Sequence, residues 1–309
     1  MGPRLLRLLG TAGALGLAVA APPLWAQAFT APKGLGSVTL AWQYVDNTGH
    51  MMSDGYLLKR GESVTTSALL EAEYAVTDRL SASFGIPYVF AKYTGAVPPL
   101  SGLPHDTCRC WNSSLQDFGF SVRYRLGGED WAVTPVLRYG LPSHDYTYQG
   151  EAVVGRNLQE VQLGALAGLK LGFLPKATVQ AAYTYAFVEK PLDDTSIDRS
   201  QGFFDIGYSA SRRLYVRAAA IWQRTHGGLR AGSVTGNPFP FPGELNTPER
   251  YSQRDRVLRS HYWQLGGGLS YSLGSVDVFA SYSNYVWGRD SHDGQVFGAG
   301  VTWYFGLPE

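Results

Sequence analysis

The chain has 309 residues, 17% of them charged, and a formal net charge of +1 at neutral pH. This near balance gives no indication of nucleic-acid binding or of electrostatic docking to a membrane surface. Nineteen Tyr, fourteen Phe, eight Trp and thirty-seven Gly are instead typical of β-structure with many tight turns.

The first residues have the pattern of a secretion signal. Two arginines precede a Gly/Ala/Leu-rich stretch over 8–21, and a small-residue cleavage site follows at Ala26-Gln27-Ala28. The apolar stretch is too short and too rich in glycine for a transmembrane helix, which needs about 20 residues. We therefore expect residues 1–28 to be a signal peptide, cut after Ala28, and residues 29–309 to form one domain.

Beyond this segment, runs of about ten residues that alternate apolar and polar side chains occur repeatedly. In the clearest run, Tyr262 to Leu273, Trp263 and Leu265 share one parity while Gln264 shares the other with Ser270. Period two puts the two sets on opposite faces of a β-strand. In chain order, strands are predicted at 37–45, 64–76, 80–91, 116–126, 131–142, 159–171, 176–188, 201–211, 213–224, 262–273, 275–287 and 295–305.

The connections between these predicted strands alternate in length. Those after the even-numbered strands are tight turns, such as Thr77-Asp78-Arg79 and Gly274. Those after the odd-numbered strands are longer, at 46–63, 92–115, 143–158, 189–200, 225–259 and 288–294. Short turns on one rim and long loops on the other are the pattern of a transmembrane barrel. The fold class predicted is an all-β, transmembrane, antiparallel up-and-down β-barrel of about 12 strands. A soluble periplasmic β-protein is the remaining alternative.

In such a barrel the polar set of alternating side chains faces the lumen, and this set includes both acidic and basic residues. We interpret these residues as either a charged constriction for a polar solute or a network of ion pairs that fills and stiffens the barrel. The candidate lumen-lining residues are Glu71, Glu73, Asp117, Arg123, Arg125, Arg138, Glu160, Lys170, Asp205, Arg217 and Asp277.

Two cysteines, Cys108 and Cys110, lie in a predicted outer loop beyond the signal segment, where disulfides are permitted. We expect a short-range disulfide between them. The alternatives are thiols paired elsewhere and a metal site completed by His105 and Asp106, and this last one lacks a second Cys/His pair. No metal and no cofactor is expected.

The tripeptide Ser-His-Asp occurs at 143–145 and again at 291–293. Adjacent residues on an extended chain point in different directions, whereas a catalytic triad requires three converging side chains. Both copies are therefore interpreted as ordinary turn residues at the start of outer loops. No catalytic residue is predicted, and the chain is not expected to be an enzyme.

Three segments in order, Glu73 to Tyr88, Gln116 to Tyr124 and Thr134 to Pro142, resemble the outer-membrane family named after the meta-pathway of phenol degradation. The similarity covers about residues 36–190, through a "Y-x-x-T-D-R/N-L … P-Y" hairpin and the strand after it. The resemblance implies a transporter-like porin for hydrophobic or aromatic compounds, and it transfers no binding residues.

The sequence thus predicts an outer-membrane channel for passive uptake of small solutes, filtered by the inward charges and the loop 225–259. The expected partners are the outer-membrane bilayer, a small-molecule solute and the barrel assembly machinery during biogenesis, with no nucleic acid. The alternatives are a closed structural or surface-binding barrel and an outer-membrane lipid-modifying enzyme.

Overall fold

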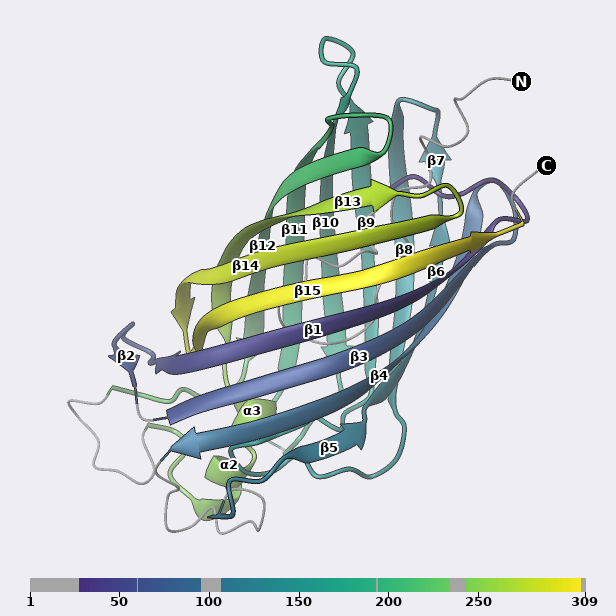
Figure 1. Cartoon of the computed structure of the whole chain (residues 1–309). Helices are drawn as coiled ribbons and strands as arrows, with labels where there is room; N and C mark the ends of the chain where they lie inside the picture. The colour runs from purple at the N-terminus through teal and green to yellow at the C-terminus, as the bar shows by residue number, and fades with distance from the viewer. Residues whose placement is uncertain (1–27, 60, 96–106, 193, 234–242, 307–309) are drawn as a thin grey trace.

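The computed structural model describes residues 28–59, 61–95, 107–192, 194–233 and 243–306, which form a closed antiparallel barrel (Figure 1). The last strand, β15 (Ser291–Phe305), pairs with the first, β1 (Gly36–Met51), from Gly36 opposite Phe305 to Met51 opposite Ser291. Closure gives each wall strand two neighbours, so that no backbone edge is left unpaired in lipid.

Within the described residues the wall has 12 strands, each paired with its neighbours in the sequence. β5, β6 and β7 are successive segments of one wall strand, which is interrupted at Gln116 and at Arg125. β2 is a two-residue strand that pairs only with the outer end of β1. Between β1 and β15 the strands are β2 (Leu57–Leu58), β3 (Gly61–Ala75), β4 (Leu80–Gly95), β5 (Asn112–Leu115), β6 (Asp117–Tyr124), β7 (Leu126–Gly127), β8 (Trp131–Pro142), β9 (Glu160–Lys170), β10 (Ala177–Val188), β11 (Ile197–Ser209), β12 (Leu214–Gly227), β13 (His261–Ser272) and β14 (Val276–Arg289).

The predicted strands and their outward parity are confirmed. Every predicted strand coincides with a wall strand and exposes large apolar side chains at the predicted positions, the surface of a barrel in a lipid bilayer. One such residue for each strand in order is Leu40, Leu70, Phe84, Val122, Leu137, Leu163, Tyr183, Phe204, Val216, Leu265, Val278 and Val301. No helix in the described part of the chain is long and apolar enough to cross a bilayer.

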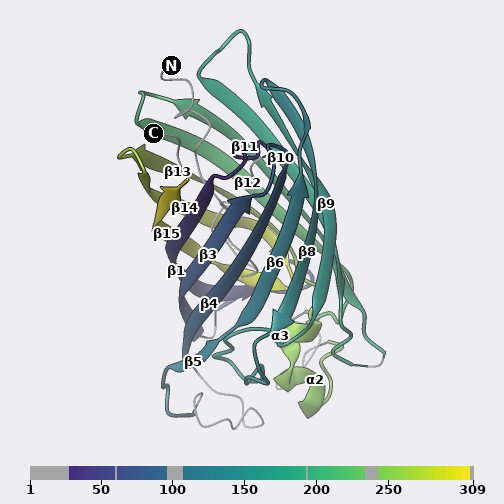
Figure 2. The same cartoon turned by 90° about the vertical axis from the view of Figure 1, so that its right-hand side faces the viewer.

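The sorting of connections is also as predicted, with one error. The short turns lie together on one rim, here called the inner rim, and the longer connections lie on the opposite, outer rim (Figures 1 and 2). The connection 288–294 was predicted to be long and is not, because β14 runs to Arg289 and β15 begins at Ser291. The Ser-His-Asp copy at 291–293, interpreted above as turn residues, therefore belongs to β15 and pairs with β1. These strands continue past the apolar belt, where β15 still pairs with β1 through His292 and His50.

The outer mouth is covered by chain that folds back over it. Residues 143–158 and 243–260, the latter with α2 (Pro248–Ser252) and α3 (Arg254–Val257), are here called the outer cap. α2 and α3 lie under the outer rim in Figures 1 and 2. The Pro/Phe-rich stretch 237–242 lies outside the described residues, as does the predicted signal peptide except for Ala28.

Candidate functional site

A cavity of about 480 Å³ lies inside the barrel between the wall and the outer cap. Its volume is within the usual range for sites that hold small molecules. It is lined by inward residues of most wall strands, including Arg138, Gln162 and Arg199, and by cap residues such as Arg156 and Arg254. The lumen is therefore neither filled throughout by side chains nor a wide open pore.

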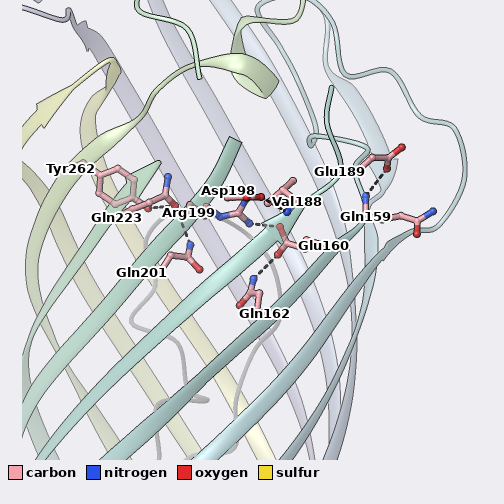
Figure 3. A network of polar contacts seen from close by, with 10 residues as sticks. All are labelled: Gln159, Glu160, Gln162, Val188, Glu189, Asp198, Arg199, Gln201, Gln223 and Tyr262. Carbon is pink, nitrogen blue, oxygen red and sulfur yellow. Dashed lines mark hydrogen bonds and ion pairs between the residues drawn. The ribbon is translucent and has the colours of Figure 1, made fainter. Parts of the chain in front are cut away.

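Charged and amide side chains form a network across one wall of this cavity (Figure 3). On β9 and β11, the Arg199 guanidinium forms an ion pair with Glu160, which also accepts a hydrogen bond from Gln162. Beside Arg199, Gln201 donates to the amide oxygen of Gln223 at 3.0 Å. Because alternate residues of a strand face the same side, neighbouring strands bring these groups together at one level.

Arg156, in the cap segment just before β9, faces this network from the loop side. Burial, followed by the nearby Arg199 guanidinium, lowers the pKa of Arg156 to about 10. At neutral pH the side chain remains charged. It lines the cavity and has no hydrogen bond or ion pair with any described residue. The sequence patterns missed Arg156, because a loop has no parity from which its orientation can be read.

The wall near the outer mouth is apolar and aromatic rather than polar. Val45, Tyr262, Tyr285 and Val296 point inward and pack together, with the two tyrosine rings edge to face at 5.2 Å. Tyr262, which the alternation places in the polar parity, lies in this apolar cluster instead of among polar groups. All four side chains are buried in the folded chain, so packing their apolar area together is favourable.

The two segments of the outer cap are tied to each other by polar contacts. Arg254 forms an ion pair with Glu151 at 2.6 Å and donates to the carbonyl oxygen of Gly150 at 2.6 Å. The Arg256 guanidinium lies 3.7 Å from the centre of the Tyr148 ring. Both side chains of the Arg254–Glu151 pair are mostly shielded from solvent, 12% and 13% exposed, so removing either partner would leave a largely buried charge unpaired.

The cap is also attached to the barrel wall. Tyr146 donates its hydroxyl proton to Asp117 of β6 at 2.5 Å and accepts a hydrogen bond from the backbone N–H of Asn157. A cluster of Tyr146, Ala152 and Val154 packs on the inward face of β4. The cap is thus held in the mouth by both buried apolar area and hydrogen bonds.

Toward the inner rim, the lumen is occupied by the start of the described chain. The N–H of Ala28 donates to Gln180 at 3.0 Å, and its carbonyl oxygen accepts from Thr134 at 2.5 Å. A Cβ on Gly168 would come within 2.8 Å of both Ala28 and Phe29, so this close approach needs a glycine. Ala28 and Phe29 belong to an apolar cluster whose members Phe203 and Ile221 also line the cavity.

The eleven residues predicted to line the lumen all lie on inward positions of the wall, and most of them contact an opposite charge or a polar group. Arg123 forms an ion pair with Glu73, Arg217 lies 3.9 Å from Asp205, and Asp277 accepts from the Tyr304 hydroxyl at 3.1 Å. The Lys170 ammonium lies 5.4 Å from the centre of the Phe29 ring. Those that border the cavity are Asp117, Arg138, Glu160 and Arg217. Their role in solute passage stays a prediction.

Two other sets of predicted residues lie outside the lumen network. Cys108 and Cys110 are joined by a disulfide, while His105 and Asp106 lie outside the described residues. No group of three potential metal ligands occurs among the described residues.

The Ser-His-Asp tripeptide at 143–145 forms no triad. Ser143 contacts the ring of its neighbour His144 at 2.8 Å, but the Asp145 carboxylate accepts a hydrogen bond from Asn157 instead. The geometry in which a base stands between a nucleophile and an orienting carboxylate is therefore not formed by these residues.

Comparison with solved structures identifies the fold. A crystal structure of an outer-membrane channel from Pseudomonas putida F1 is similar to this chain with a TM-score of 0.68 and 12% identity, over 90% of this chain and 98% of that one. The NanC porin has a TM-score of 0.51 with 10% identity, over 86% and 98%. The translocator domain of the autotransporter NalP from Neisseria meningitidis has a TM-score of 0.50 with 13% identity, over 88% and 89%.

The fold and its apolar outer face are those of a protein of the bacterial outer membrane. No protein-family model matches the sequence, and no curated protein matches it. Membership in the phenol meta-pathway family therefore stays a prediction. At sequence identities of 10–13%, the solved structures establish a shared fold but not a shared activity.

Proposed function

We propose that this chain is an outer-membrane channel for the passive uptake of small solutes and not an enzyme. The observation that carries the proposal is the cavity of about 480 Å³ inside a closed barrel, lined by charged, amide and aromatic side chains from both wall and cap. Conduction needs sites that a solute can enter and leave, and mixed linings of this kind provide them. The similarity in fold to a channel and to a porin supports the proposal.

The proposal includes the signal peptide over residues 1–28 and insertion by the barrel assembly machinery. The solutes we propose are small hydrophobic or aromatic compounds, in line with the apolar part of the lining around Tyr262 and Tyr285. Solute would pass between the outer cap and the wall, cross the charged level at Arg138 and Glu160, and leave past the cluster at Phe203.

Reconstitution of the purified barrel tests this function. We expect discrete single-channel currents in planar lipid bilayers and swelling of liposomes loaded with an impermeant osmolyte when small aromatic solutes are added outside. A folded barrel, verified by heat-modifiable mobility on a gel, that gives neither current nor solute uptake would rule out the channel and leave a closed structural barrel.

Arg138→Glu tests whether the charged level of the lumen lies on the path of ions. Arg138 lines the cavity on β8, and its reversal exchanges a positive for a negative charge beside Glu160. We expect the reversal potential in a salt gradient to shift toward cation selectivity, because charges in a narrow lumen set the ion preference. A loss of stability with unchanged selectivity would instead assign Arg138 to a structural ion-pair network.

A further inference from the structure

The strongest unassigned feature is a pair of guanidinium groups that line one cavity, of which only one forms an ion pair with a described carboxylate. Arg156 of the cap, Arg199 of β11 and Glu160 of β9 all line the cavity, and Arg199 forms the ion pair with Glu160. The carboxylate of Glu160 is already engaged by Arg199 and by Gln162. Glu160 therefore balances the charge of Arg199, and Arg156 lines the same cavity without an ion pair to a described residue.

Hydrogen-bond donors of both guanidiniums remain unused. Arg156 makes no hydrogen bond with a described residue, and Nε and Nη1 of Arg199 are buried without a partner. Other carboxylates face this region, but each contacts another group. Asp117 accepts a hydrogen bond from Tyr146, and Asp255 lies 3.8 Å from His292. Guanidinium N–H donors without a protein partner in a cavity shielded from water can bind a planar carboxylate.

An apolar surface lies next to these donors. Tyr262 is close enough to Arg156 to interact electrostatically with it, and it packs against Tyr285 and Val45 along the cavity wall. Leu258 of the cap borders the same space. A ligand that fits both surfaces has an anionic group at one end and an aromatic or apolar body at the other.

We propose that the cavity is a binding site for organic anions with an apolar body, such as aromatic carboxylates, held by Arg156 and the open edge of Arg199. This inference deepens the proposed function, since such an anion would be a solute of the channel. It concerns equilibrium binding, however, and therefore can be tested without any measurement of transport.

The test is equilibrium dialysis of radiolabelled benzoate against the purified full-length barrel in detergent micelles, with protein-free micelles as the blank. We expect saturable binding that unlabelled benzoate displaces at a concentration at least about tenfold lower than acetate or benzyl alcohol does. Acetate lacks the apolar body and benzyl alcohol lacks the charge. Displacement by either probe as efficient as displacement by benzoate, or the absence of saturable binding, would overturn the proposal.

Arg156→Gln supplies the decisive variant. Because Arg156 makes no hydrogen bond with a described residue, its replacement leaves no such partner unsatisfied, and heat-modifiable mobility verifies that the barrel folds. We expect the dissociation constant for benzoate to rise about tenfold or more. The matched control is Arg250→Gln, a cap arginine paired with the exposed Asp194 outside the cavity, which should leave binding unchanged. Equal affinities of wild type and Arg156→Gln would overturn the site.

Binding and transport separate the two proposals. Saturable, Arg156-dependent binding in a barrel that conducts no solute would refute the channel and support the site. Solute uptake by a barrel that binds no benzoate would support the channel and refute the site.

Discussion

Removal of α2 and α3 is expected to raise the single-channel conductance by about twofold or more, because the outer cap narrows the mouth through which ions enter. The variant replaces residues 247–257 with a short Gly-Ser linker, which deletes the Arg254–Glu151 ion pair and the contact of Arg256 with Tyr148. The wall strands pair with one another without this segment, so the barrel should still close. Planar-bilayer recordings measure the effect.

Point variants refine this experiment. Arg254→Gln removes the buried ion pair to Glu151 but leaves the apolar cluster beneath α2 and α3, so we expect an increase in conductance smaller than that of the deletion. Arg250→Gln removes only the surface pair with Asp194, and should leave the conductance at the wild-type value. If the deletion variant is folded and conducts like the wild type, the cap does not limit the current.

Leu265→Arg is expected to lower the free energy of unfolding by about 2–4 kcal/mol, the cost of an arginine on the lipid face near the bilayer midplane. Leu265 lies in the middle of β13, and its side chain is 51% exposed on the outer surface. The charge would have to be stabilised by water and headgroups that are distant at that depth. Denaturant unfolding of the barrel in phospholipid vesicles gives the free energy.

The matched control for this change lies on the same face, directly after the end of β13. Leu273 is 58% exposed beside the inner turn at Gly274, where the arginine can reach the interface, so Leu273→Arg should cost only about 0–1 kcal/mol. Equal and small losses for both variants would contradict a membrane-spanning position of this face and favour a soluble barrel.

The outward-facing side chains of the wall could be identified from the sequence, because successive side chains of a strand alternate between its two faces. The alternation around Trp263 and Leu265 predicted which side chains of β13 are exposed, and the same reasoning held for the other wall strands. Short turns could be recognised from Gly and Asp at fixed places, and their sorting predicted which rim each strand end reaches. The connection 288–294 was predicted wrongly because its residues pair with β13 and β1 without an alternation of apolar and polar side chains that could be detected.

The contacts of the inward-facing side chains were predicted less well, since they depend on which loops and side chains fill the lumen. Glu73 and Arg123 were both placed inward by parity, but that they form an ion pair follows from the register of β3, β4 and β6. Tyr262 was grouped with the polar parity, yet it packs in a buried apolar cluster with Val45, Tyr285 and Val296. Arg156 belongs to a loop, so its guanidinium could be placed only by the folded chain.

A closed, oriented barrel in lipid can be derived from the sequence alone, because period-two alternation and alternating connection lengths are local properties of the chain. The division of the lumen, in contrast, depends on tertiary contacts. The cap at Arg254 and Glu151, the Ala28–Phe29 segment near the inner rim, and the cavity between them with Arg156 and Arg199 all join residues far apart in the sequence. Such contacts depend on how loops fold back into the barrel, and no periodicity of a strand encodes that.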